Sequence, residues 1–210
     1  MDGYQPLIAE IREIVGRIAV SYKDERLAEW ALSGPIEVVE DGNDVRFSSG
    51  SIPTGRLPSP EPDSDLPIWT IDRAVLVELA LRTASARAKR WLVDEQRLLP
   101  MPESWRAVLR STAQERFKCE TSIGAGWVDL LLAVDDWLVE IGQPATWGQI
   151  KEKYAGIRLY ADNSFDEPGN DIIDHAENGY SQNVCETCGA PGRTRDRSGW
   201  SYTSCDEHVK

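Results

Sequence analysis

Three cysteines and one histidine near the end of the chain have the spacing of metal ligands. Two residues separate Cys185 from Cys188, and two residues separate Cys205 from His208. Such a spacing lets one tight turn present two ligand atoms to the same ion, and two such turns complete a tetrahedral zinc shell. Because four protein ligands leave no position for water or a substrate, the pattern predicts a structural Zn²⁺ site.

The segment between the two ligand pairs, residues 189–204, is rich in glycine and arginine and too polar to form a core of its own. Zinc supplies on the order of 10 kcal/mol of folding free energy to a small finger, more than burial gives a tail of about 30 residues. We therefore expect zinc to hold a ribbon over residues 182–210. Gly189 can adopt the positive φ that a metal-binding turn needs, and Trp200 is expected to pack over that turn.

A second metal arrangement uses a different histidine. His175 and Glu177, followed by Cys185 and Cys188, resemble the H-x-E…P-C-x-x-C signature of zinc deaminases, in which the glutamate transfers protons. Only seven residues separate Glu177 from Cys185, and Val184 stands in place of the proline. This arrangement also leaves Cys205 and His208 without a role, so we interpret His175 as a surface or interface histidine on a helix.

Other catalytic groups are sparse. The sequence contains no phosphate-binding loop, dinucleotide fingerprint, H-E-x-x-H or G-x-S-x-G motif. Asp135 and Asp136 are adjacent on an expected helix, where neighbouring side chains diverge, and are interpreted as a polar face. Cys119 has no nearby histidine or basic cluster and is interpreted as a buried thiol. We expect a protein that is not an enzyme.

Composition narrows the class of protein. The 210 residues include 35 acidic and 23 basic side chains, giving a formal net charge of −12, with 41% hydrophobic residues. Such a chain can bury a core, but general phosphate-backbone binding is disfavoured because it needs clustered Lys and Arg. The first residues lack a signal-peptide pattern, and no apolar stretch is long enough to span a membrane. We expect a cytoplasmic protein without a membrane partner, and the sequence does not predict its oligomeric state.

Helical periodicity and turn residues predict the elements of the first half. Helices are expected from Pro6 to about Ser21 and from Asp24 to Leu32, followed by a hairpin around residues 41–44. A proline-rich linker is expected over residues 49–67. A long helix capped by Thr70 should then continue to residue 98 or 99, with a solvated basic face over residues 82–90.

The second half is expected to combine helices with one strand pair. Helices are predicted over residues 103–117 and 127–141, connected through Gly124-Ala125-Gly126. Two strands should meet near Ala155-Gly156 within residues 147–160, and a helix should start at Pro168 and end near Tyr180. The predicted fold class is α+β, helix-rich with two short β-hairpins and a C-terminal Cys3His zinc ribbon. The domains are expected at residues 1–100 and 101–210.

Four segments of the second half carry specific motifs: ERFKCETSIGAGW, QIKEKYAGIRLY, HAENGYSQNVCETCGAPG and GWSYTSCDEH. Together, over about residues 102–208, they resemble an uncharacterised family of small phage and bacterial proteins with a KEKFGGLRFY-like strand pair and a C-terminal CxxCG…CxxH zinc ribbon. In this chain Ala155 replaces the first glycine of the strand turn, and Leu159 replaces an aromatic residue. The resemblance implies a zinc-ribbon module and a phage or mobile-element setting, and residues 1–100 lie outside it.

These observations lead to three functional hypotheses. The first is a non-enzymatic zinc-containing protein of phage or mobile-element type that binds a host protein or complex in the host cytoplasm. It would inhibit a defence complex, in the manner of an anti-CRISPR protein, or a nucleic-acid-processing complex. The second is a nucleic-acid-binding regulator that uses helix 82–90 and the ribbon arginines, and the third is the deaminase-like enzyme. The candidate interaction residues are Lys151, Lys153, Arg158, Arg193, Arg195 and Arg197.

Overall fold

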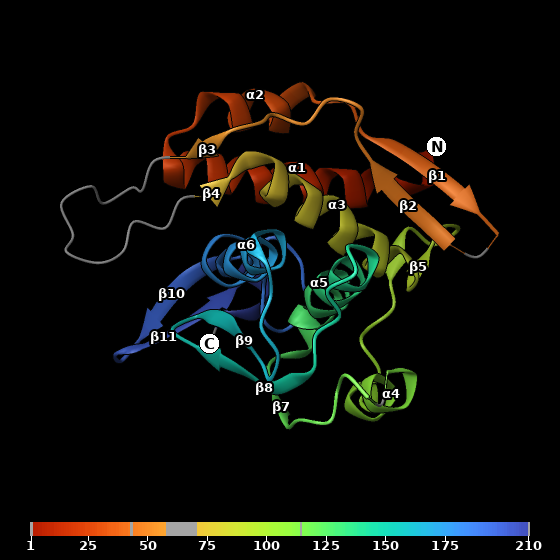
Figure 1. Cartoon of the computed structure of the whole chain (residues 1–210). Helices are drawn as coiled ribbons and strands as arrows, with labels where there is room; N and C mark the ends of the chain where they lie inside the picture. The colour runs from red at the N-terminus through yellow and green to blue at the C-terminus, as the bar shows by residue number, and fades with distance from the viewer. Residues whose placement is uncertain (1, 43, 58–70, 114, 210) are drawn as a thin grey trace. The chain divides into compact units, whose positions relative to one another are not determined.

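A computed structural model of the chain (Figure 1) describes residues 2–42, 44–57, 71–113 and 115–209. The chain divides into two compact units, Met1–Leu98 and Leu99–Lys210, which we describe separately. The α+β class and the C-terminal Cys3His cluster are confirmed. Among the described residues, no helix is both long enough and apolar enough to cross a membrane.

Two helices open the first unit, as the periodicity predicted. They are α1 (Gln5–Tyr22) and α2 (Glu25–Ser33). The Asp24 carboxylate accepts a hydrogen bond from the Leu27 N–H (2.8 Å) and so caps α2. The buried stripe of α1 consists of Leu7, Ile11, Ile14, Val15, Ile18 and Ala19.

The expected hairpin is present, and a further strand pair follows it. β1 (Glu37–Asp41) pairs with β2 (Asp44–Ser48) in antiparallel register. β3 (Arg56–Leu57), within the segment predicted as a linker, pairs with β4 (Ile71–Asp72). Residues 49–55 of the predicted linker form no helix or strand, and residues 58–67 lie outside the described residues, as does Thr70.

The helix predicted to continue to residue 98 or 99 is shorter. α3 (Arg73–Ala88) starts after Asp72, whose side chain accepts a hydrogen bond from the Ala74 N–H, and β5 (Trp91–Leu92) then pairs with β6 (Arg97–Leu98). The Trp91 indole N–H donates to the Gly3 carbonyl (2.8 Å), and this bond holds residue 91 in a strand conformation instead of a continued helix. This long-range contact explains why the helical pattern stops early.

The basic segment 82–90 is not the solvated face that we predicted. Arg87 is only 4% exposed, and its guanidinium pairs with the Glu10 carboxylate on α1 (3.0 Å). Arg82 pairs with Glu78 one helical turn earlier. Two of the basic groups of this helix are therefore neutralised within the unit.

The second unit is built on a small sheet and a buried helix. α4 (Trp105–Thr112) is shorter than predicted, whereas α5 (Val128–Glu140), preceded by a 3-10 turn (Ala125–Trp127), matches its prediction closely. The sheet has the strand order β7-β8-β9, with β7 (Thr121–Ser122) parallel to β8 (Trp147–Lys153) and β8 antiparallel to β9 (Gly156–Ala161). Its core includes Phe117, Trp127, Leu130, Val134, Trp147, Ile150, Ile157 and Ile172.

The outer edge of β9 is covered by side chains from a helix end. α6 (Glu167–His175) continues into a π-helical turn (Ala176–Tyr180) and a 3-10 turn (Ser181–Asn183). The Ser181 hydroxyl accepts a hydrogen bond from the Ile157 N–H (3.2 Å), and the Glu177 carboxylate accepts one from the Leu159 N–H (2.6 Å). These bonds satisfy strand groups that would otherwise lack partners.

The chain ends in the predicted ribbon. β10 (Arg193–Arg197) and β11 (Trp200–Ser204) form an antiparallel hairpin closed by Ser198 and Gly199. Both loop residues have positive φ, 54° and 86°, as the tightest hairpin turn requires.

Asp24 connects two helices of the first unit, and its substitution tests that connection. Its carboxylate caps α2 and pairs with Arg73 at the start of α3. We expect Asp24→Ala to lose about 2–3 kcal/mol of unfolding free energy, from one cap and one charge-assisted pair. Asp24→Asn keeps a capping oxygen and should lose less. Urea denaturation followed by circular dichroism measures both, and equal losses would contradict the assignment.

The same ion pair should make stability depend on pH. Hydrogen bonds from Arg73 lower the pKa of Asp24 below its ordinary value. A carboxylate whose folded pKa is lowered contributes stability above its unfolded pKa, about 3.9, and loses that contribution as pH falls towards the folded value. The stability difference between the wild type and Asp24→Asn should therefore shrink below about pH 4.

Candidate metal centre

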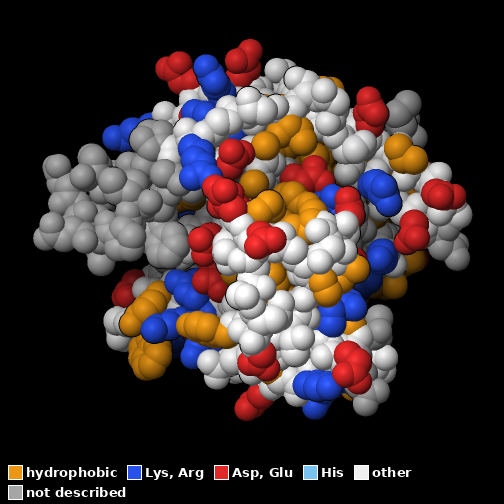
Figure 2. Space-filling view, in the orientation of Figure 1, with side chains coloured by type: hydrophobic (Ala, Val, Ile, Leu, Met, Phe, Trp, Pro, Cys, Tyr) orange, Lys and Arg blue, Asp and Glu red, His pale blue; other side chains and the backbone are white. Residues whose placement is uncertain are grey.

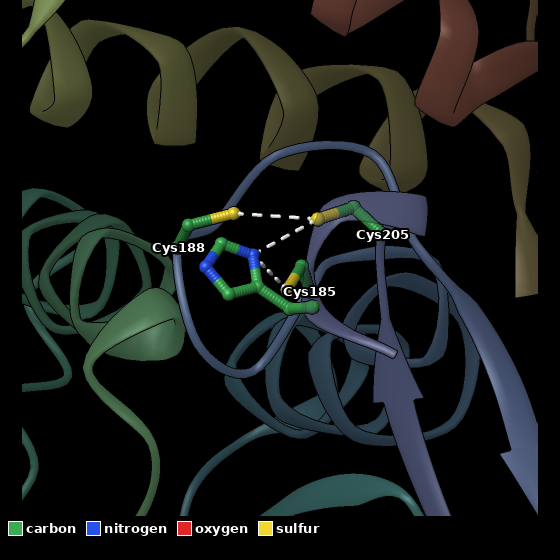
Figure 3. Close-up of side chains that lie close together, drawn as sticks. Cys185, Cys188 and Cys205 are labelled. Atoms are coloured by element: carbon green, nitrogen blue, oxygen red, sulfur yellow. Dashed lines mark hydrogen bonds between the residues drawn. The ribbon is translucent and has the colours of Figure 1, made fainter. Parts of the chain in front are cut away.

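The structure brings the four predicted ligands together at one point (Figure 3). Their potential ligand atoms all lie within 4.8 Å of one another, and Cys185 is the most buried of the four. The Cys188 and Cys205 sulfurs are 3.8 Å apart, and the His208 Nδ1 atom lies 3.1 Å from the Cys205 sulfur. Two sulfurs on one tetrahedral zinc ion stand ~3.8 Å apart, because each Zn–S bond is ~2.3 Å long. The four side chains therefore fit one metal ion.

The first ligand pair lies in a tight turn that the backbone itself stabilises. The Gly189 N–H donates to the Cys185 carbonyl (2.9 Å), and the Cys185 N–H donates to the Ala190 carbonyl (2.8 Å). Gly189 has a φ of 77°, so the positive φ predicted there is confirmed. The Glu186 N–H donates to the Thr203 carbonyl of β11 (2.9 Å), which holds the first turn beside the ribbon.

The second ligand pair follows directly from β11. Cys205 comes immediately after the strand, and a 3-10 turn over Asp206–His208 brings the imidazole back towards the sulfurs. The His208 N–H donates to the Cys205 carbonyl (3.3 Å). Strand β11 therefore positions both ligand pairs: Cys205 follows it directly, and the turn that carries Cys185 and Cys188 is hydrogen-bonded to it at Thr203.

Hydrogen bonding within the cluster prepares Cys185 to act as a thiolate. The hydrogen bond with the Cys188 thiol lowers the pKa of Cys185, and backbone N–H groups of the two turns lower it further. The same bond raises the pKa of Cys188. Since metals bind the thiolate, binding of a metal ion at this cluster would release protons.

Two glycines allow the start of α5 to approach the first ligand turn. The Gly126 N–H donates to the Glu186 carbonyl (2.9 Å), and the Trp127 indole N–H donates to the buried Val184 carbonyl (2.9 Å). A Cβ atom on Gly126 would stand 2.1 Å from the Cys185 carbonyl oxygen, and one on Gly124 would stand 2.1 Å from that of Glu186. Sequence reasoning treated Gly124–Gly126 only as a connection, although a G-x-G-W run beside a buried helix was the available signal.

The β8–β9 turn also contacts the ribbon. Tyr154 and Ala155 form its two-residue loop with positive φ values of 53° and 62°, where a glycine would be unstrained. The buried Ala155 carbonyl accepts a hydrogen bond from the Thr203 hydroxyl (2.7 Å). The turn in which this chain departs from the resembled pattern is thus a contact to β11.

His175 and Glu177 are not part of the cluster. Among the described residues, no other group of three or more His, Cys, Asp or Glu side chains lies close enough to hold a metal ion. His175 is buried rather than at the surface, and its Nδ1 atom lies 2.5 Å from the Asp171 carbonyl. Burial raises the pKa of Glu177, whose carboxylate accepts from β9 as described above.

Asp135 and Cys119, the other two residues considered for catalysis, both lie in surroundings that do not favour a catalytic role. Asp135 does not belong to a polar helix face: it is buried and pairs with Arg116 (2.7 Å) while accepting a hydrogen bond from the Trp147 indole (3.0 Å). Cys119 is half-buried, and burial raises the pKa of its thiol, which opposes nucleophilic use.

The candidate interaction residues of the strand pair lie on one face. Lys151 stands opposite Arg158 across the β8–β9 register, and Lys153 follows two residues along β8. Each lysine lies over an exposed tyrosine ring: Lys151 is 4.9 Å from the Tyr160 centroid, and Lys153 lies over Tyr154. Arg158 instead turns inward, where it donates to the Ile157 carbonyl.

The ribbon arginines divide into two that are paired and one at the tip. Arg193 and Arg195 both contact the Asp206 carboxylate. Arg197 stands opposite Trp200 at the hairpin end, where Figure 2 shows basic and apolar side chains together at the lower left. Trp200 is 79% exposed, so the expectation that it packs over the metal-binding turn is wrong. Its place beside the tight loop directs it to solvent.

Removing one sulfur ligand should weaken metal binding strongly. We expect the wild type to bind one zinc ion per chain and Cys188→Ser to lose it on dialysis against a chelator, because one of the four protein ligands is replaced by water or a weaker hydroxyl. Cys119→Ser is the matched control, since Cys119 lies outside the cluster. Metal analysis by mass spectrometry measures the content of each, and zinc retained by Cys188→Ser but lost by Cys119→Ser would refute the site.

The close approach at Gly126 gives a second test. Gly126→Ala introduces a Cβ that must displace the Cys185 backbone. We expect a loss of about 1–3 kcal/mol of stability and weaker zinc binding, because the turn that holds two ligands moves. Gly50→Ala is the control, since a Cβ there meets nothing within 4 Å. Thermal unfolding and a competitive zinc titration would show the difference, and identical behaviour of the two variants would contradict the contact.

Comparison of the chain with protein-family models, with curated proteins and with solved structures found no match. The resemblance of residues 102–208 to a phage and bacterial family therefore stays an expectation from sequence. The geometry itself shows a possible Cys3His metal site formed by Cys185, Cys188, Cys205 and His208.

Proposed function

We propose that this chain is a zinc-ribbon protein that acts by binding another protein and not by catalysis. The observation that carries the proposal is the closed ligand set of Cys185, Cys188, Cys205 and His208. Such a set can fasten the β10–β11 hairpin, whose tip carries the exposed Trp200, without leaving a coordination position for a substrate. Exposed tryptophan and arginine side chains are enriched where proteins bind each other.

The proposed metal is zinc, and its role is structural. Three thiolates and one imidazole form a donor set that zinc accepts readily, whereas calcium and magnesium prefer oxygen ligands. When bound, zinc supplies four bonds that connect the turn after α6 to the end of β11. The protein's own contacts, from Glu186 to Thr203 and from Gly126 to Glu186, orient that turn.

A protein partner fits the charges better than a nucleic acid. The chain carries a net charge of −12. Of the basic groups considered for phosphate contacts, Arg193 and Arg195 contact Asp206, and Arg87 is buried against Glu10. Neutralised arginines release few counterions, which is the main source of affinity for nucleic acid.

We further propose that the partner is a host protein in a defence or nucleic-acid-processing complex. The support is the phage-type resemblance of the second half together with the acidic charge. An acidic protein is attracted to basic channels that normally hold nucleic acid, and this attraction accelerates association.

The experiment is capture of partners by the tagged, zinc-loaded full chain from a lysate of the cell that carries the gene, followed by mass spectrometry. We expect one protein or complex to be retained by the wild type and by Cys119→Ser, and lost by Cys188→Ser. Titration calorimetry with the purified partner then gives the affinity. Retention by all three proteins alike, or steep salt-dependent binding to plain DNA or RNA, would oppose the proposal.

A further inference from the structure

A groove of about 550 Å³ lies beside the ribbon in the second unit. Its lining includes Trp200 and Ser201 of β11 on one side and Ile123, which follows β7, on the other. Arg197 contributes from the hairpin end. The volume is within the range of ligand-binding clefts in proteins, roughly 300–1,000 Å³.

The hairpin register determines which backbone groups face this groove. Arg197 and Trp200 flank the two-residue loop and therefore form a hydrogen-bonded pair, as do Arg195 and Tyr202. Ser201 and Thr203 alternate with them, so their N–H and C=O groups point away from β10. The hydrogen bond from the Glu186 N–H to the Thr203 carbonyl confirms this direction.

On the outer edge of β11, the Thr203 carbonyl thus accepts a hydrogen bond from Glu186, whereas the backbone groups of Ser201 face the groove. Within the part of the chain that the structure describes, no strand pairs with β11 other than β10. By contrast, the opposite side of the groove is already satisfied, because Arg106 donates to the Thr121 carbonyl (3.0 Å) and the Ile123 carbonyl (3.0 Å). An incoming chain would therefore pair with β11.

The charges in the groove favour a polypeptide over a polyphosphate. Glu152 and Glu186 line it together with Arg106 and Arg197, so both signs are present. A phosphate backbone would meet the two carboxylates. An extended peptide can place an apolar side chain against Trp200 and a carboxylate beside Arg197. Among the described residues, no carboxylate forms an ion pair with Arg197.

We propose that this groove binds an extended segment of the partner protein, which adds as a strand to β11 at Ser201 and packs an apolar side chain on Trp200. Main-chain hydrogen bonds and a side-chain pocket are together the usual basis of such strand addition. This inference rests on the proposed function, since it names the surface through which protein binding would occur.

The test uses random peptides of about a dozen residues, displayed on phage and selected against the zinc-loaded full chain. The most enriched peptide is synthesised, and its affinity is measured by fluorescence anisotropy. We expect Trp200→Ala to weaken binding roughly tenfold or more, as removal of a central aromatic anchor does. Tyr160→Ala, which removes an exposed aromatic ring outside the groove lining, should bind as the wild type does.

Ser201→Pro tests the main-chain pairing. It removes the outward N–H without breaking a bond to β10, so peptide binding should fall about tenfold or more, whereas Ser201→Ala keeps that N–H and should bind normally. Unchanged zinc content shows that each variant is folded. In the wild type, the peptide should also slow hydrogen exchange of the Ser201 amide, which does not depend on any substitution.

Three results would overturn the groove assignment. They are absence of any enriched peptide, equal binding of the peptide by wild type, Trp200→Ala and Ser201→Pro, and displacement of the peptide by oligothymidylate. A captured partner that still binds Trp200→Ala and Ser201→Pro but not Cys188→Ser would also refute the groove, while the proposed function would stand.

Discussion

The second unit depends on a close approach between two backbones. The turn that starts α5 and the turn that holds Cys185 meet so closely that neither Gly124 nor Gly126 has room for a Cβ. Hydrogen bonds from Gly126 to the Glu186 carbonyl and from Trp127 to the Val184 carbonyl then join the Cys185 turn to the start of the buried helix α5. The Cys3His cluster is therefore fastened to the hydrophobic core on one side and to β11 on the other. This arrangement differs from a polar tail that metal alone would order, which was the expectation from composition.

Local patterns accounted for the Cys3His cluster and most of the helices. The spacing of Cys185 and Cys188 reflects the geometry of one turn, so it could be interpreted without knowledge of the rest of the chain. The same is true of Gly189, whose positive φ is a property of that turn. The stripe of α1 and the cap at Asp24 also lie within a few residues of one another, where periodicity and capping rules apply.

Contacts between distant residues could not be predicted in this way. The early end of α3 follows from a hydrogen bond between Trp91 and Gly3, and the burial of Asp135 follows from Arg116 and Trp147 on other elements. Trp200 was misplaced for a related reason: an aromatic residue near metal ligands suggested packing, but the tight loop beside it fixes which way it faces. For α3 and Asp135 the deciding partner lies far away in the sequence, whereas for Trp200 it is the adjacent Ser198-Gly199 loop that decides.

The covered edge of β9 has a consequence for the protein in concentrated solution. An uncovered strand edge is a template on which chains add to one another and aggregate. Glu177 and Ser181 occupy the outward N–H groups of Leu159 and Ile157, so these two groups of β9 are not available to a second chain. Because β11 is open only over a short stretch beside Ser201, a second chain could not continue the sheet far. In the second unit, the contacts of Glu177 and Ser181 on β9 and the short open stretch of β11 thus both oppose growth of a sheet from one chain to the next.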